Sequence, residues 1–140
     1  MTDSIFTKIL VGDIPGEIIY QDNSVFVILT IQPFTPGHML VVPKAQIDHL
    51  WDVDADTYHH LFDVAKQMQA KLKQAYPEYQ RTGLLVEGFG VPHAHVHVFG
   101  YLHPLEETVT DHLEWKKRRG DKPFATPEEL GEAAGKLRTA

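Results

Sequence analysis

Residues 93–99 read His-Ala-His-Val-His-Val-Phe, and this alternation restricts the fold more than any other segment of the chain. Successive side chains of an extended strand point to opposite faces of a sheet. His93, His95 and His97 therefore share one face, and the small or branched apolar residues between them share the other. The chain must form a sheet that buries the apolar face of this strand and lines the opposite face with imidazole groups.

The residues alone leave three interpretations of this imidazole row open: a polar face without chemistry, a metal site, and a catalytic array. Three histidines are a known ligand set for catalytic zinc, but the first and third Cα atoms lie about 13 Å apart in a strand, which is long for one ion. The preceding turn favours catalysis, because Gly88 and Gly90 leave backbone N–H groups accessible to a phosphate. Histidine is a nucleophile toward phosphorus and a proton donor.

Segments rich in β-branched and aromatic residues predict a sheet. The predicted strands are residues 18–20, 25–31, 38–43, 82–87 and 94–99. The first two are separated by Gln-Asp-Asn-Ser, a composition typical of turns, which indicates a hairpin. Paired strands, then one long helix, then further strands predict an α+β fold: an antiparallel sheet of about five strands with one long helix packed on it.

The long helix is predicted over residues 54–76, where apolar side chains recur every three or four positions. The recurring residues are Tyr58, Phe62, Ala65, Met68, Leu72 and Ala75. Asp54 precedes the run and Pro77 follows it, as expected at helix ends. The adjacent His59 and His60 are expected at solvated or boundary positions of this helix, outside any site.

A short helical tail is predicted at the C-terminus. Thr126 can cap a helix, Pro127 suits its first position, and Glu129 completes a capping box. Gly131 and Gly135 are expected to fray the helix that follows.

Composition excludes several classes of protein. The 140 residues suit one domain, and the absence of cysteine excludes disulfides, thiolate metal ligands and a cysteine nucleophile. A net charge of −6 argues against a nucleic-acid surface, and the basic run at residues 116–119 is interpreted as a solvated patch. No apolar stretch is long enough to span a membrane, and the first residues do not resemble a leader. We therefore expect a cytoplasmic protein with no nucleic-acid or membrane partner.

The segment at residues 93–99 resembles the His-φ-His-φ-His-φ-φ signature of the histidine triad (HIT) family of nucleotide hydrolases and transferases, and the Hint-type branch in particular. Four other segments are similar to the family in order and spacing: residues 4–9, 12–15, 19–22 and 36–44. The resemblance covers residues 3–102, which are expected to form a HIT domain. Residues 103–140 are left as a C-terminal extension of unassigned role.

This resemblance implies a homodimer that acts on a purine nucleotide without a cofactor. His95 would attack the α-phosphorus and form a nucleotidyl-histidine intermediate, which water converts to a nucleoside monophosphate such as AMP. On the same resemblance His97 contacts the phosphate, His93 orients the nucleophile through its backbone carbonyl, and His38 supports the array. The implied nucleotide-binding residues are Phe6, Ile9, Ile14, Ile28, Leu29, Thr30, Ile31, Gly88, Gly90 and Val91.

A nucleoside phosphoramidase is the first expectation, because an amine can depart after protonation without a specialised loop. Two alternatives are a dinucleoside polyphosphate hydrolase and a nucleotide-binding regulatory module with little turnover. A metal-dependent enzyme that uses the histidines as ligands is a further hypothesis.

The sequence also departs from the family pattern. Thr30 stands where Hint-type members place an acidic residue that binds the ribose diol, and the segment at residues 86–92 is short. Many bacterial members carry zinc ligands where this chain has Ser4, Thr7 and Gln46, so no structural zinc is expected.

Overall fold

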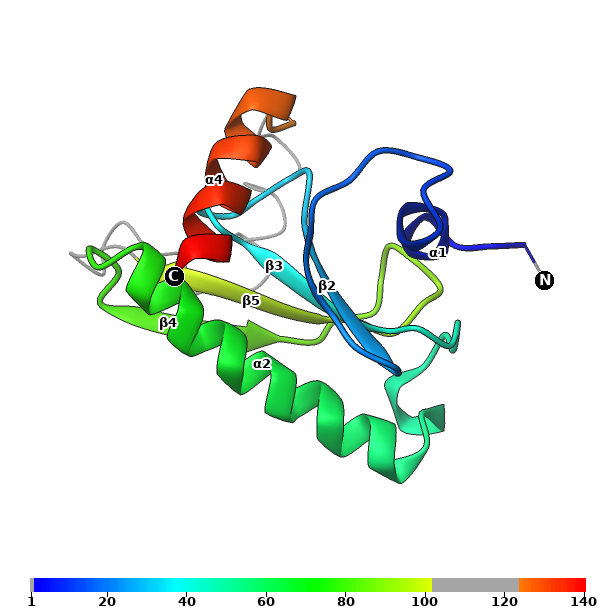
Figure 1. Ribbon diagram of the computed structural model, residues 1–140. Coiled ribbons are helices and arrows are strands. Elements are labelled where there is room, and N and C mark those ends of the chain that lie inside the picture. The colour runs from blue at the N-terminus through cyan, green and yellow to red at the C-terminus, as the bar shows by residue number, and fades with distance from the viewer. Residues whose placement is uncertain (1, 102–123) are drawn as a thin grey trace.

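The computed structural model describes residues 2–101 and 124–140, which form one five-stranded sheet with helices on both faces (Figure 1). The sheet runs in the order β1-β2-β3-β5-β4, and every neighbouring pair is antiparallel. The predicted α+β class with a five-stranded antiparallel sheet and one long helix is thus confirmed. In chain order the elements are α1 (Ile5–Leu10), β1 (Ile18–Gln21), β2 (Val25–Leu29), β3 (Met39–Pro43), the 3-10 helix η1 (Leu50–Asp52), α2 (Ala55–Ala75), β4 (Arg81–Leu85), β5 (Val96–Tyr101) and α4 (Pro127–Thr139).

Strand β5 begins later than the alternation predicts. It starts at Val96, so His93 and His95 lie in the segment that leads into the strand. The backbone N–H of Ala94 donates to the carbonyl of Ile47 at 2.7 Å instead of joining the ladder of the sheet. The alternation of faces nevertheless persists, because Ala94 packs in the same core cluster as the apolar residues of β5.

Two other strands end earlier than predicted. Strand β2 stops at Leu29, so Thr30 and Ile31 lie in the loop toward β3. Strand β4 stops at Leu85, which leaves Glu87 in the loop that precedes the histidines. Because both strands end early, Thr30 and Glu87 lie in loops, and both residues line one cavity with His95 and His97.

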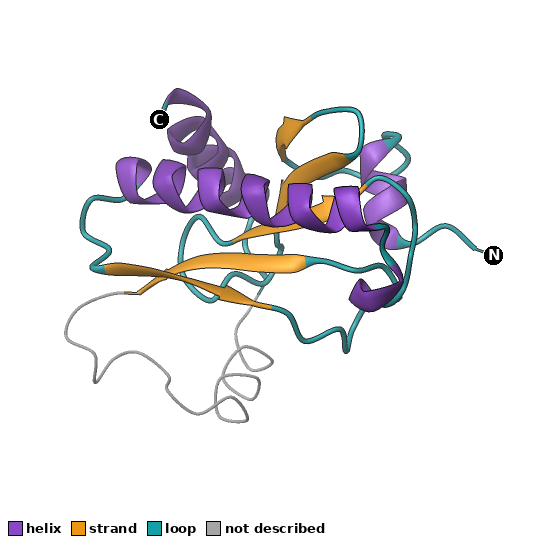
Figure 2. Cartoon of the chain, turned by 90° about the horizontal axis from the view of Figure 1, so that it is seen from below, coloured by secondary structure: helices purple, strands orange, loops and turns teal. Residues whose placement is uncertain are grey.

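The two faces of the sheet are covered by different helices. Helices α2 and α4 lie on the same side, as Figure 2 shows, and their buried residues belong to one large core cluster with Val25, Val27 and Leu29 of β2. The alternate residues Phe26 and Ile28 pack on the other side, in a cluster that includes a side chain of α1. Because both faces are covered, all five residues of β2 are buried and apolar.

Helix α2 confirms the predicted long amphipathic helix, with a corrected inner face. Asp54 is its N-cap, and its side chain accepts a hydrogen bond from the backbone N–H of Thr57 at 3.1 Å. Tyr58, which belongs to the predicted apolar face, is 37 % exposed. The buried positions are Leu61, Val64, Ala65, Met68 and Leu72. No described helix is long and apolar enough to cross a membrane.

Helix α4 confirms the capping box at Thr126 and Glu129 but not the predicted fraying. It continues through Gly131 and Gly135 to Thr139. Each glycine costs a helix interior roughly 1 kcal/mol, and burial of Leu137 and two alanines in the main core offsets this cost. The basic run at residues 116–119 lies outside the described residues.

Candidate active site

The four predicted histidines lie together, where β3 and β5 pair beside α1. His97 of β5 pairs with Leu40 of β3 and therefore lies on the face of the sheet that α1 covers. His38 Nε2 is 2.9 Å from His97 Nδ1, and the rings of His95 and His97 are 5.0 Å apart between centroids. His38, His93 and His97 are at most 1 % exposed, and His95 is 7 % exposed.

The tautomer of His95 is set by a backbone carbonyl. Its Nδ1 lies 2.8 Å from the carbonyl oxygen of His93, which can only accept, so Nδ1 carries the proton and donates. A neutral His95 then keeps a lone pair on Nε2. The ring lines a cavity, and Phe6 of α1 packs against it edge-on at 5.0 Å between ring centroids. A neutral ring in this tautomer has one nitrogen with the lone pair that a nucleophile requires.

A second chain of hydrogen bonds sets the protons of His38 and His97. The backbone N–H of Phe34 donates to His38 Nδ1 at 2.9 Å, so a neutral His38 carries its proton on Nε2. That proton is donated to Nδ1 of His97 at 2.9 Å. A neutral His97 therefore carries its own proton on Nε2, as a donor beside His95.

His93 is anchored on both ring nitrogens. Nε2 donates to the carbonyl of Pro43 at 2.7 Å, and Nδ1 accepts from the hydroxyl of Ser4 at 2.6 Å. Burial lowers the pKa of His93, and the neighbouring His95 lowers it further. The neutral ring fits this arrangement of one donor and one acceptor, and it fixes the carbonyl that orients His95.

Ser4 belongs to a small network that the sequence did not predict. It caps α1 by accepting from the backbone N–H of Thr7 at 3.1 Å, and its own N–H donates to Gln46 Oε1 at 2.7 Å. The hydroxyl of Thr7 donates to the same oxygen at 3.1 Å. Helix α1 has six residues, which is too short for a clear periodic pattern.

The residues of this network do not fit zinc, which some members of the resembled family bind at these positions. Two hydroxyls, an amide and one imidazole lack the thiolate, carboxylate or second imidazole that zinc sites use. The imidazole nitrogen nearest to them, Nδ1 of His93, already accepts from Ser4. Within residues 2–101 and 124–140, no three His, Cys, Asp or Glu side chains are grouped as metal ligands.

A cavity of about 660 Å³ opens beside His95 and His97, and its wall is mainly apolar. Of the predicted nucleotide-binding residues, the following line it: Phe6, Ile9, Ile14, Ile28, Leu29, Thr30, Ile31, Gly90 and Val91. Gly88 is not among the lining residues, but its φ of 68° is one that glycine adopts readily, so it shapes the turn. The volume suits a small-molecule ligand such as a nucleotide.

Besides the histidines, three polar side chains line the cavity and distinguish it from an ordinary apolar pocket: Thr30, Gln32 and Glu87. Thr30 is 6 % exposed, and its hydroxyl accepts from the backbone N–H of Gln32 at 3.3 Å. The side chain of Glu87 is 9 % exposed, and its Oε1 lies 3.9 Å from Nε2 of His97. No role was predicted for Glu87 from the sequence; the available signal was its place in the short segment at residues 86–92, which precedes the histidines.

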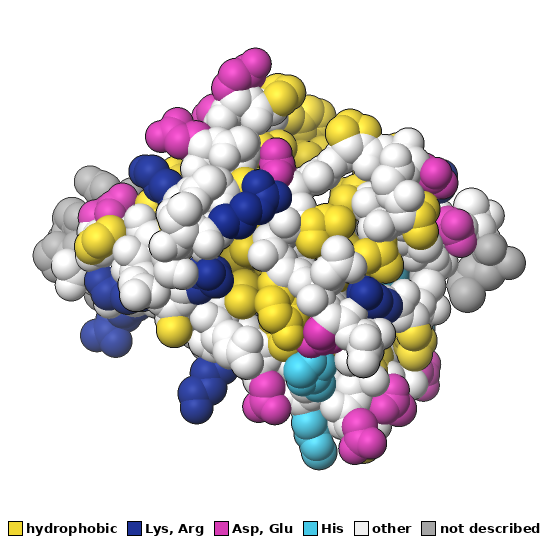
Figure 3. Space-filling model, viewed as in Figure 1, with side chains coloured by type: hydrophobic (Ala, Val, Ile, Leu, Met, Phe, Trp, Pro, Cys, Tyr) yellow, Lys and Arg dark blue, Asp and Glu magenta, His cyan; other side chains and the backbone are white. Residues whose placement is uncertain are grey.

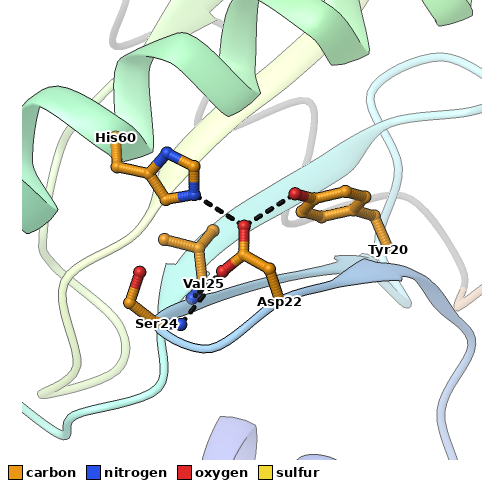
Figure 4. A network of polar contacts seen from close by, with 5 residues as sticks. All are labelled: Tyr20, Asp22, Ser24, Val25 and His60. Carbon is orange, nitrogen blue, oxygen red and sulfur yellow. Dashed lines mark hydrogen bonds and ion pairs between the residues drawn. The ribbon is translucent and has the colours of Figure 1, made fainter.

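His59 and His60 lie on α2, away from these histidines. His59 is exposed, and Figure 3 shows histidine side chains at the surface along α2. His60 is partly buried and contacts Asp22 Oδ2 at 2.6 Å (Figure 4). Their expected solvated and boundary positions agree with these surroundings.

Comparisons with known proteins agree with this geometry. The model of the HIT domain matches residues 11–103. An uncharacterised HIT-like protein from Borreliella burgdorferi is 34 % identical over 104 residues, which cover 70 % of this chain and 75 % of that protein.

Two solved structures share the fold. A Hit-like protein of Bartonella henselae, described as involved in cell-cycle regulation, matches with a TM-score of 0.80 and 24 % identity, covering 98 % of this chain and 95 % of its own. A hypothetical histidine triad nucleotide-binding protein of Sulfolobus tokodaii matches with a TM-score of 0.69 and 22 % identity, covering 96 % and 89 %. At these identities the likeness shows the fold alone.

Proposed function

The chain belongs to the HIT domain family, and from this premise we propose that it hydrolyses a purine nucleoside phosphoramidate or a related nucleotide conjugate at the α-phosphorus. One observation carries the proposal: His95 Nδ1 donates to the carbonyl of His93 at 2.8 Å. The proton of the neutral ring is therefore on Nδ1 and the lone pair is on Nε2, in a side chain that lines the cavity. The apolar wall suits a purine nucleoside. His95 is the proposed nucleophile.

The reaction proceeds in two displacements at phosphorus. The leaving nitrogen takes a proton from solvent, His95 Nε2 bonds to the α-phosphorus, and the electron pair of the broken P–N bond goes to the departing amine. Water then attacks the nucleotidyl-histidine, the electron pair of the P–Nε2 bond returns to His95, and one proton is released. The product is AMP or a related nucleoside monophosphate.

The other histidines stabilise this sequence. His97 donates from Nε2 to a phosphoryl oxygen, because His38 occupies its Nδ1. His38 is in turn fixed by the backbone of Phe34. His93 holds the acceptor for His95 and stays neutral. No cofactor or metal is needed for these steps.

We further propose that the protein acts as a homodimer in the cytoplasm. Nucleic acid and membranes are not proposed partners. Two other functions make different predictions: a dinucleoside polyphosphate hydrolase prefers a phosphate leaving group, and a regulatory module binds nucleotide with little turnover. A metal-dependent enzyme would lose its activity to a chelator.

The test is hydrolysis of a fluorogenic adenosine phosphoramidate and of diadenosine tetraphosphate, with and without chelator. We expect release of AMP that survives the chelator, and a nucleotidyl adduct on His95 found by mass spectrometry after rapid quenching. The His95→Ala variant should lose turnover by several orders of magnitude, as removal of a covalent nucleophile does.

The matched control is His59→Ala, which removes an exposed histidine of α2 and should keep the wild-type rate. Nucleotide binding without an adduct or turnover would favour the regulatory module. Activity that chelator abolishes and a divalent ion restores would favour the metal-dependent enzyme.

A further inference from the structure

Glu87 is the one carboxylate among the described residues that line the cavity with His95 and His97. Its Oε1 lies 3.9 Å from His97 Nε2, and its side chain is 9 % exposed. A nucleotide phosphate in the same place carries negative charge, and like charges repel strongly where water is largely excluded. The carboxylate therefore restricts which substrates can be bound and cleaved there.

The contact between Glu87 and His97 places the carboxylate close to the phosphorus that would react. The rings of His95 and His97 are 5.0 Å apart, so a phosphoryl group attacked by one and contacted by the other lies close to both. Because Glu87 approaches the Nε2 side of His97, its carboxylate lies beside that phosphoryl group. Apolar residues of α1 and β2 also line the cavity, and such residues suit the nucleoside.

We propose that Glu87 is a specificity-determining residue that favours amine leaving groups over polyphosphate leaving groups. This inference rests on the function proposed above and deepens it. The protonated P–N nitrogen donates a hydrogen bond to the carboxylate while the P–N bond breaks, and its electron pair stays with the departing amine. Glu87 neither gains nor loses a proton. A polyphosphate leaving group places further negative charge beside the same carboxylate and is disfavoured.

The experiment compares wild-type protein and Glu87→Gln on two substrates, an adenosine phosphoramidate of an aliphatic amine and diadenosine tetraphosphate. Glutamine keeps the shape of the side chain and removes its charge. We expect kcat/KM to fall about tenfold for the phosphoramidate and to rise about tenfold for the tetraphosphate, on the scale of one close charge interaction. The loss with the phosphoramidate should appear in kcat, because the positive charge on nitrogen is needed in the transition state.

Two further variants separate this effect from damage to the fold. Glu87→Asp keeps the charge and should keep the preference for the phosphoramidate, whereas Asp63→Asn removes one charge from an exposed site on α2 and should change neither rate. Equal changes for both substrates in Glu87→Gln, with the adduct still forming on His95, would overturn the role of Glu87 and leave the proposed function standing. A wild-type protein that forms no adduct with either substrate would overturn both proposals.

Discussion

Backbone groups, more than charged side chains, set the tautomers of the four histidines in the candidate site. The carbonyl of His93 fixes His95, and the N–H of Phe34 fixes His38 and through it His97. A backbone carbonyl only accepts and a backbone N–H only donates, so each of these rings has one preferred tautomer in its neutral form. For His93 a side chain adds to this control, because Nε2 donates to the carbonyl of Pro43 while Nδ1 accepts from the hydroxyl of Ser4.

Ser4→Ala should therefore impair both stability and catalysis. It leaves the buried Nδ1 of His93 without its donor and removes the N-cap of α1. The free energy of unfolding should fall by about 1–3 kcal/mol, the usual cost of an unsatisfied buried polar group. We also expect a lower kcat on a phosphoramidate, since the carbonyl of His93 is less firmly placed. Urea denaturation and steady-state kinetics measure the two effects.

Thr7→Ala is the control for this prediction. It removes a hydroxyl that donates to Gln46 but keeps the backbone N–H that Ser4 caps. Its kcat should stay close to that of the wild type. If both variants lower kcat equally, the effect comes from α1 as a whole and not from the bond between Ser4 and His93.

Elements with a regular side-chain pattern were predictable, and those held by distant contacts were not. The spacing of apolar residues predicts α2, and Thr126 with Glu129 predicts the start of α4. Helix α1 depends on the bond from Ser4 to Gln46, which is 42 residues away in the chain. The pattern of neighbouring residues in the sequence cannot predict a hydrogen bond between residues so far apart in the chain.

In the candidate site too, some features were predictable from the sequence and others depend on contacts between distant residues. The histidines and most of the cavity wall follow from the alternation at residues 93–99 and from the family resemblance. The start of β5 was missed, because Ala94 bonds to Ile47 outside the ladder. The place of Glu87 depends on where β4 ends and how the following loop turns, which the order of residues does not specify.

The turn between β1 and β2 is tied to α2 by Asp22 (Figure 4). Burial raises the pKa of Asp22, but hydrogen bonds from Tyr20, His60 and the N–H groups of Ser24 and Val25 outweigh it and hold the pKa well below the ordinary value. The folded state therefore prefers the ionised carboxyl. This contribution to stability is present above the ordinary carboxyl pKa of about 4 and is lost as the pH falls below it.

Asp22→Asn should consequently lower the free energy of unfolding in a pH-dependent way. At pH 7 we expect a loss of about 1–3 kcal/mol, because hydrogen bonds to a charged acceptor are replaced by weaker ones. The difference from wild type should shrink as the pH falls from about 4 toward 2. Urea titrations at several pH values measure it, with Asp63→Asn as an exposed control on α2. If the two free energies of unfolding differ by the same amount at every pH, the ionised carboxyl of Asp22 is not the source of the stabilisation.

At the scale of the molecule, α4 belongs to the main core. Ala134 and Leu137 are fully buried in the cluster that α2 and the sheet share. Lys71 of α2 donates to the carbonyl of Leu137 at 2.9 Å, and Arg138 contacts Glu17, just before β1, at 3.0 Å. The end of the chain therefore holds α2 and β1 in place (Figure 1).

Leu137→Ala should destabilise the whole protein and not α4 alone. A buried leucine replaced by alanine costs about 2–5 kcal/mol through lost transfer energy and the cavity left behind. Glu132→Ala, on the exposed side of the same helix, should change stability little. Unfolding followed by far-ultraviolet circular dichroism should remain one transition. A separate early transition would mean that α4 unfolds independently of the sheet.

The proposed homodimer should form through β4. This strand ends the sheet and, among the described residues, pairs with β5 on one edge only. Leu84 of β4 and Val86 just beyond it are each 40 % exposed, and an apolar strand edge invites pairing with another strand. A second copy related by a twofold axis would continue the sheet antiparallel across both chains.

Sedimentation equilibrium should give twice the 15.9 kDa of the chain. Leu84→Lys should shift this mass toward the monomer, because it places a charge in the apolar contact. Val11→Lys, at a position 61 % exposed after α1, is the control and should remain dimeric. A dimer that resists Leu84→Lys would place the interface away from β4, and a wild-type monomer would refute the dimer itself.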